Sequence, residues 1–244
     1  MRYRLLQARI EGDVVRSEER VAFSKRLGVP VEHIDQLHMV DGNVTYKRAT
    51  EGVDCVLVGG SGAFGMYADV PWMSEFVDTL GEIARTGFPM FGSCFGFQGM
   101  VVALGGSVLP DDDSSEVGTY EVSLQPAGGR DPLFGDLPAK FNAQLGHKDR
   151  AFEFPSSLEN LIASERCPYQ ALRVAGKPVY ATQFHPELTW EENRMRFSRY
   201  FDMYKVAFGD EEAERKMREG FRPSPEANDL LPRFAAMLQA GELG

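Results

Sequence analysis

The first half of the chain alternates short apolar runs with longer amphipathic segments. Residues 3–8, 55–58 and 89–91 are apolar runs typical of buried strands. Residues 17–27, 71–84 and 95–104 repeat their apolar positions at helical spacing, and Gly28 and Pro71 suit a helix end and a helix start. Because strand and helix alternate, the pattern predicts an α/β fold with a mainly parallel sheet.

The second half changes character after the acidic loop at 111–115. Short strand-like runs follow one another and predict antiparallel strands or hairpins that extend the sheet: 119–124, 141–145, 160–164, 169–174 and 179–184. Residues 191–208 and 210–218 are predicted to be helical, and a turn at 223–225 precedes a last apolar segment in which Pro232 predicts a break or kink. We therefore expect a main domain over 1–190 and a C-terminal helical extension over 191–244, packed on that domain or in contact with a second copy of the chain.

Composition narrows the function classes. The chain has 244 residues, with 26 basic and 36 acidic side chains and a net charge of −10. This balance argues against nucleic-acid binding, which needs clustered Lys and Arg, and favours a small-molecule substrate. No apolar run approaches the ~20 residues that cross a membrane, so a cytoplasmic location is expected. The three cysteines form no CxxC pair, and so sparse a count indicates a reducing compartment. Their spacing is not that of metal ligands, so neither a metal nor a cofactor is expected.

Cys94 stands out from the other two cysteines by its setting. It follows a predicted strand, precedes a predicted helix and has Gly92 and Gly96 two residues away on either side. Such a sharp strand–turn–helix elbow presents a nucleophile at the carboxyl edge of the sheet, and the helix N-terminus favours the thiolate. Cys55 and Cys167 lack this setting and are predicted to be buried structural residues.

A cysteine nucleophile needs a base, and the base needs a group that orients it. His185 follows a strand-like run, and Glu187 lies two residues on, on the same side of an extended chain. His147 is the rival base, since it also follows a strand-like run and has Asp149 two residues on. Spacing alone leaves both open, whereas His33 lies in a polar segment and is predicted to be a surface or structural residue, as is His38.

Taken together, the elbow Gly92-Ser93-Cys94-Phe95-Gly96-Phe97-Gln98 and the segment His185-Pro186-Glu187 resemble the motifs of the class I glutamine amidotransferase family. The resemblance covers roughly residues 50–190 and is strongest to stand-alone relatives of the glutaminase domain of GMP synthetase. It implies a flavodoxin-like three-layer sandwich and favours His185 over His147 as the base.

The resemblance also implies roles for further residues. Gly60 and Phe95 would supply the backbone N–H groups of an oxyanion hole, although Ser61 stands where the family commonly has proline. Four residues would bind the substrate: Gly59, Gln98, Gly146 and His147.

The resulting hypothesis is an enzyme that attacks the glutamine side-chain amide through a Cys94–His185–Glu187 triad and a γ-glutamyl thioester. It would release ammonia to a separate synthetase, because the residues after Glu187 are too few for an ATP-dependent synthetase and contain no phosphate-binding loop. Two alternatives remain at this stage. One is a γ-glutamyl peptidase or hydrolase that uses the same triad, and the other is a catalytically silent binding module.

Overall fold

A computed structural model describes residues 1–201, 215 and 218–243. Its main sheet has nine strands in the order β2-β1-β3-β4-β11-β10-β9-β6-β7. The first five strands in this order pair in parallel. They are β2 (Ile34–His38), β1 (Tyr3–Ala8), β3 (Cys55–Ser61), β4 (Met90–Ser93) and β11 (Val179–Thr182).

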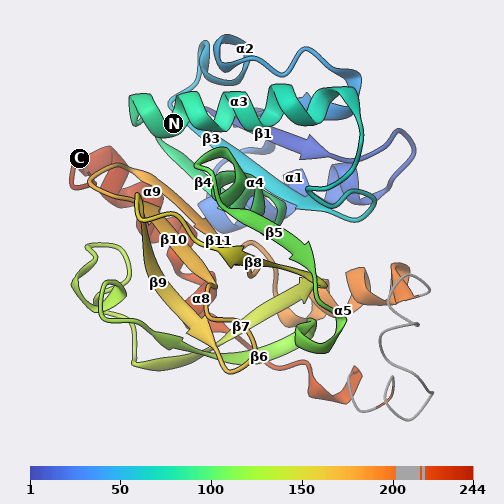
Figure 1. Cartoon of the computed structure of the whole chain (residues 1–244), viewed down its shortest axis with the longest axis vertical. Coiled ribbons are helices and arrows are strands. Elements are labelled where there is room, and N and C mark those ends of the chain that lie inside the picture. The colour runs from blue at the N-terminus through green and yellow to red at the C-terminus, as the bar shows by residue number, and fades with distance from the viewer. Residues whose placement is uncertain (202–214, 216–217, 244) are drawn as a thin grey trace.

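The other four strands of the sheet continue it by antiparallel pairing. They are β10 (Ala171–Val174), β9 (Leu158–Ser164), β6 (Glu116–Leu124) and β7 (Lys140–His147). A separate two-stranded ribbon joins β5 (Ser107–Pro110) to β8 (Asp149–Glu153). Figure 1 shows this antiparallel part below the parallel part.

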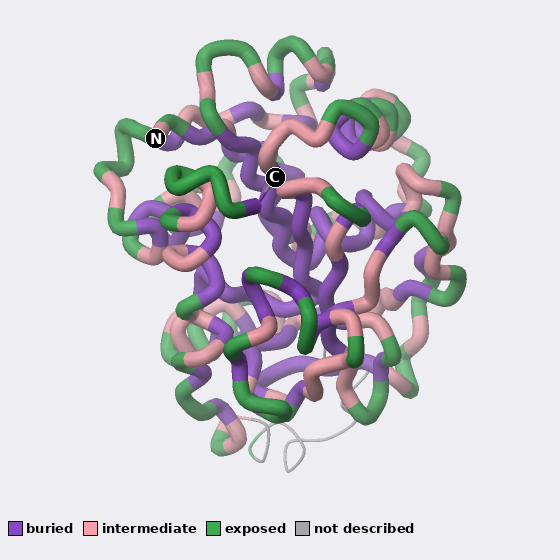
Figure 2. The backbone as a smooth tube through the Cα atoms, turned by 90° about the vertical axis from the view of Figure 1, so that its left-hand side faces the viewer, coloured by how far each residue is buried: buried purple, intermediate pink, exposed green. Residues whose placement is uncertain are grey.

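Helices cover both faces of the parallel part because its strands are apolar on both sides. Along β3, Val56 and Val58 pack with the cluster that includes α2 (Tyr46–Thr50), α3 (Pro71–Thr86) and α4 (Phe95–Ala103). The intervening Cys55 and Leu57 pack on the opposite face with α1 (Val15–Leu27), α8 (Pro225–Asn228) and α9 (Leu230–Ala240). The strands thus form a buried layer, and the exposed positions lie toward the outside of the molecule, as the tube in Figure 2 shows.

The predicted fold class is confirmed, including the mainly parallel core, the antiparallel strands and a helical C-terminal extension. Helices α1, α3 and α4 lie within two residues of their predicted ends. Strands β2, β5 and β8 were not predicted, since these short segments mix polar and apolar residues without a clear period. The domain division at residue 190 stays a prediction.

The expected break at Pro232 is wrong. Helix α9 begins at Leu230 and runs through Pro232, while the chain turns at Asp229 instead. Pro232 lies in the first helical turn, where a backbone N–H has no partner inside the helix, so its missing N–H costs nothing. Helix α5 (Trp190–Arg199) begins one residue before its predicted start. The rest of the predicted 191–208 and 210–218 helices lies largely outside the described residues.

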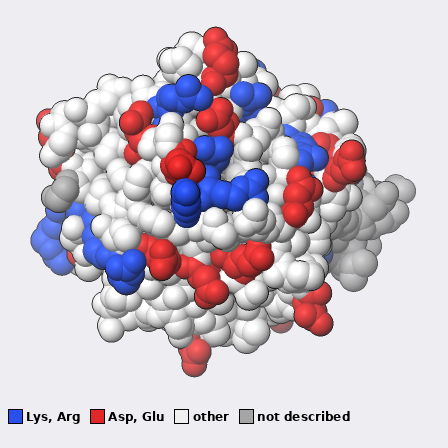
Figure 3. Space-filling model, turned by 90° about the horizontal axis from the view of Figure 1, so that it is seen from above, with Lys and Arg blue, Asp and Glu red and all other residues white. Residues whose placement is uncertain are grey.

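Over the part of the chain that the structure describes, no helix is long and apolar enough to cross a membrane. The face seen in Figure 3 carries Lys and Arg interspersed with Asp and Glu, without a continuous basic patch.

Candidate active site

Cys94 occupies a strained turn between β4 and α4. Its backbone has φ 52° and ψ −92°, a left-handed region that non-glycine residues seldom adopt. The turn is held by the Cys94 N–H, which donates to the carbonyl of Thr182 on β11 at 2.7 Å. Its flanking glycines are required by close packing: a Cβ at Gly96 would lie 2.8 Å from Cβ of Val58. The predicted elbow is therefore present.

His185 and Glu187 lie in the segment that follows β11, the strand next to β4. Nδ1 of His185 is 2.7 Å from Oε1 of Glu187, and both side chains are buried. The other oxygen of Glu187 accepts a hydrogen bond from the Ser93 hydroxyl at 2.9 Å. The Arg196 guanidinium on α5 lies 3.7 Å from Oε1. Glu187 is thus held from three sides.

The charges of this pair stabilise one another. Burial by itself would lower the pKa of His185, but the Glu187 carboxylate and the hydrogen bond to Cys94 outweigh it and raise that pKa to about 9. Burial would also raise the pKa of Glu187, but the His185 imidazolium and then Arg196 outweigh this and lower that pKa to about 2. At neutral pH the pair is therefore an imidazolium and a carboxylate.

Cys94 lies beside His185, where it helps to raise the pKa of His185, and the residue is 6% exposed. Gln183 donates a hydrogen bond to Sγ from its amide, at 3.5 Å. The same side chain accepts from Nε2 of Gln98 at 3.3 Å, and Gln98 also donates to the carbonyl of Asp149 at 3.2 Å. Gln98 therefore connects α4 to the chain around Asp149.

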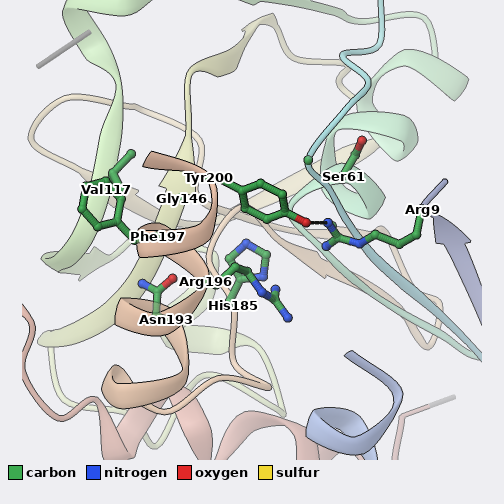
Figure 4. A pocket seen from close by; sticks show the side chains of 11 residues that line it. Arg9, Ser61, Val117, Gly146, His185, Asn193, Arg196, Phe197 and Tyr200 are labelled. Atoms are coloured by element: carbon green, nitrogen blue, oxygen red, sulfur yellow. Dashed lines mark hydrogen bonds between the residues drawn. The ribbon is translucent and has the colours of Figure 1, made fainter. Parts of the chain in front are cut away.

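A pocket of about 160 Å³ opens beside the sulfur of Cys94. Its wall includes Phe95, Gln98 and the loop 146–149 on one side and the glycine-rich segment 61–65 on the other. A smaller adjoining pocket of about 20 Å³ lies beside His185 and is shown in Figure 4. Ser61, Gly62 and Gly146 line both pockets, so the two share a wall between Cys94 and His185.

Gly60 lies next to both His185 and Cys94, since a Cβ there would be 3.0 Å from the His185 ring and 3.8 Å from Cβ of Cys94. Its N–H, however, donates to Oε1 of Glu19 at 3.0 Å. Glu19 is fully buried and paired with the buried Arg9 at 2.9 Å. Gly59 faces the same carboxylate, and a Cβ there would lie 2.4 Å from its carbon.

His147, the other candidate base, is hydrogen-bonded to Glu116 and Asp149 and not to Cys94. Its Nε2 is 3.1 Å from Oε2 of Glu116, and its Nδ1 is 3.1 Å from the carbonyl of Asp149. His33 is exposed, and His38 accepts a hydrogen bond from Arg16. Of the histidines, His185 is the one that the structure brings to Cys94.

The sequence analysis did not assign several residues to the site that the structure places there: Arg9, Glu19, Ser93, Gln183, Asn193, Arg196 and Tyr200. Ser93 lies within the elbow motif and Gln183 lies two residues before His185, and this proximity was the signal that could have identified them. Arg196 and Asn193 come from α5, whereas Arg9 comes from the end of β1 and donates to the Tyr200 hydroxyl at 3.0 Å (Figure 4). These contacts depend on how distant elements pack, which no local pattern encodes.

The site combines a sharp strand–helix elbow at Cys94 with a buried His–Glu pair on a mixed sheet. Comparison with known proteins identifies the class of protein that has this arrangement. Residues 24–203 match the family model of glutamine amidotransferase class-I. The chain therefore belongs to this family.

Among curated relatives, the chain is 36% identical over 116 residues to the GMP synthase (glutamine-hydrolyzing) of Aliivibrio fischeri and 34% identical to that of Vibrio cholerae. Each match covers 48% of this chain and 22% of the relative. A glutamine amidotransferase structure from Thermotoga maritima superposes with a TM-score of 0.71 at 21% identity, covering 98% of this chain and 97% of that one. One from Methylobacillus flagellatus gives 0.64 at 19% identity, covering 99% and 91%. These structures support the fold.

Proposed function

We propose that the chain hydrolyses the side-chain amide of glutamine, with Cys94 as nucleophile, His185 as acid and base, and Glu187 as the group that orients His185. The observation that carries the proposal is the line of contacts from the Cys94 thiol through His185 to Glu187 beside a pocket. Membership in the glutamine amidotransferase class-I family supports glutamine as the amide.

The reaction then follows from the charges. The Cys94 thiolate attacks the amide carbon, and the carbonyl electrons move onto oxygen. His185 gives its Nε2 proton to the amide nitrogen, the C–N bond breaks, and ammonia leaves a γ-glutamyl thioester. His185 next takes a proton from water, the hydroxide attacks the thioester, and the C–S bond breaks to release glutamate.

Two backbone donors are proposed for the oxyanion. The N–H of Phe95 follows the sulfur at the start of α4, and that of Gly60 lies across from it. The Gly60 N–H would have to leave Glu19 to take part, so this donor requires a rearrangement around Glu19. Gln98, Gly146 and His147 line the Cys94 pocket and are proposed to contact the substrate. Gly59, which precedes Gly60 and faces the Glu19 carboxylate, is proposed to contact it as well.

The ammonia is proposed to pass to a separate acceptor enzyme. Support comes from the curated relatives, which are named as glutamine-hydrolyzing GMP synthases and of which this chain matches 22%. A synthetase partner that forms GMP is the corresponding candidate acceptor.

The proposal is tested by following glutamate and ammonia release from glutamine for the wild-type chain, Cys94→Ser and Cys55→Ser. Cys55 is a matched control because it is also a buried free cysteine but begins β3 and does not line the Cys94 pocket. We expect Cys94→Ser to lose at least about a thousandfold in kcat/KM and Cys55→Ser to keep the activity.

A mass-spectrometric search for the γ-glutamyl adduct on Cys94 accompanies the assay. Equal activity of wild type and Cys94→Ser would exclude Cys94 as nucleophile. Cleavage of γ-glutamyl peptides in preference to glutamine would replace the glutaminase assignment by a peptidase that uses the same thioester.

A further inference from the structure

A second group of chemically reactive side chains lies behind the loop that lines the Cys94 pocket. Glu116 begins β6, His147 ends β7, and Cys167 lies in the turn between β9 and β10. Glu116 and His147 are direct partners in the β6–β7 register. One ligand atom from each of the three residues lies within 4.8 Å of the other two, and all three side chains are buried.

The hydrogen bonds of His147 leave one nitrogen facing the group. Nδ1 lies 3.1 Å from the carbonyl of Asp149, which can only accept, so Nδ1 carries a hydrogen. Histidines that bind a metal through Nε2 are oriented in this way, by a hydrogen bond from Nδ1 to a backbone carbonyl. Nε2 points at Oε2 of Glu116, 3.1 Å away. Two lone pairs at that distance need a positive charge between them, which a proton or a metal ion supplies.

Glu116 adds an independent indication. The side chain is fully buried, and Oε2 accepts from the Gln170 amide at 2.5 Å. Its other oxygen, Oε1, has no hydrogen-bond partner among the residues that the structure describes. A buried carboxylate oxygen without a partner is costly, and a bound cation would remove that cost. Oε1 of Gln170, also buried, likewise has no partner within the described chain.

We propose that Glu116, His147 and Cys167 bind one Zn²⁺ ion. A thiolate, an imidazole and a carboxylate form a donor set that zinc accepts and that Mg²⁺ and Ca²⁺, which prefer oxygen ligands, do not. On binding, the Cys167 thiol gives its proton to solvent, as does Nε2 of His147 where it carries one, and the ion forms bonds to Sγ, Nε2 and a Glu116 oxygen. A water molecule or Gln170 completes four-coordination.

The ion has a route to this position. A pocket of about 460 Å³ opens from solvent onto Glu116 between β6 and β9. Glu121 and Glu165 line it together with Lys140 and Arg166, and Lys140 pairs with Glu121 at 2.7 Å, so the pocket gives solvent access to Glu116. The ligands come from three separate strands or turns, so the ion would tie β6 and β7 to the β9–β10 turn. Because His147 also lines the Cys94 pocket, the metal would fix the substrate-side loop 146–149 without taking part in the reaction.

Cobalt substitution tests the site without using activity. The purified chain is treated with a chelator and titrated with Co²⁺, and the near-ultraviolet thiolate-to-cobalt band and the visible d–d bands of tetrahedral cobalt are recorded. We expect saturation at one ion per chain and displacement by Zn²⁺. Cys167→Ser removes a direct ligand, so it should weaken Co²⁺ binding by at least the ~100-fold that the loss of an outer-shell partner can cost. Cys55→Ser and Cys94→Ser should retain the bands.

The thermal midpoint of the wild-type chain, measured with Zn²⁺ and with chelator, gives a readout that does not depend on whether the variants fold. We expect Zn²⁺ to raise it and chelator to reverse the rise. No cobalt bands and no thermal shift would mean that a proton alone joins His147 to Glu116. Bands that persist in Cys167→Ser but vanish in Cys94→Ser would place the ion at the other cysteine and overturn the proposal.

Discussion

At the scale of single residues, the site depends on buried charges that stabilise one another. His185, Glu187 and Arg196 form one such group, and Arg9 with Glu19 forms another. A buried charge that loses its partner costs several kcal/mol, so these side chains are constrained by stability as well as by chemistry. The two groups meet at Gly60, whose N–H bonds Glu19 and whose Cα faces His185.

The raised pKa of His185 predicts a loss of stability at alkaline pH. Because its pKa rises from 6.5 to about 9 on folding, the imidazolium contributes stability that is complete below pH 6.5 and is lost as pH rises to about 9. We expect the free energy of unfolding to fall by on the order of 3 kcal/mol over this range, measured by urea denaturation.

His185→Gln should remove this alkaline fall, and His33→Gln, at an exposed position, should leave it in place. An identical fall in His185→Gln would show that another group carries the pH dependence. On the acid side, the lowered pKa of Glu187 predicts a separate loss as pH falls from 4.5 toward 2.

At the scale of elements, the elbow works because β3, β4 and α4 approach closely. The Cys94 amide is anchored on β11, and the first turn of α4 presses against Val58 of β3. The elbow could be predicted from sequence because glycine spacing and the strand–helix order are local. Helix α5 could be placed only roughly, although its Thr189–Glu192 capping box is also local. Its contribution of Asn193 and Arg196 to the site could not be foreseen.

Gly96→Ala is predicted to disturb this packing. The added Cβ would lie 2.8 Å from Cβ and 3.2 Å from the carbonyl oxygen of Val58, so β3 or α4 must shift. We expect a loss of roughly 1–3 kcal/mol in unfolding free energy together with reduced glutaminase activity.

Gly81→Ala in α3 is the matched control, because the nearest atom to its Cβ is 3.8 Å away. There the change should be neutral or stabilising by roughly 0.5–1 kcal/mol, since alanine favours helix. If the two variants unfold at the same urea concentration, close packing against Val58 does not explain why position 96 requires glycine.

At the scale of the whole molecule, the C-terminal segment is part of the core. Helix α9 lies against α1 and the sheet face that carries Phe91 and Tyr180, and it closes that face over the parallel strands. The ring of Phe234 packs edge-on to Phe91 at 5.3 Å and to Tyr180 at 5.9 Å. The sequence indicated an apolar segment here but left open whether it packs on the domain or contacts a second copy of the chain.

Phe234→Ala is predicted to destabilise the entire chain. The side chain is fully buried, so its loss should cost roughly 3–5 kcal/mol and lower the urea midpoint in a single transition. Gln239→Ala, on the exposed side of the same helix, should change stability by less than about 0.5 kcal/mol. A two-step transition, with the α9 signal lost first, would show that the extension unfolds independently.

The sequence by itself determined β1, β3 and β4 of the parallel part, the elbow at Cys94 and the His185–Glu187 pair, because each depends on residues near one another in the chain. It did not predict β2, and it placed 179–184 among the antiparallel strands, whereas β11 pairs in parallel with β4. Tertiary structure decided that His185 reaches the thiol while His147 turns to Glu116, since strand order and the β6–β7 register set where these side chains point. It also decided that Glu19 holds the Gly60 N–H, that Arg196 reaches Glu187, and that Cys167 joins Glu116 and His147. These groups meet only when distant strands and helices pack, so no spacing along the chain could reveal them.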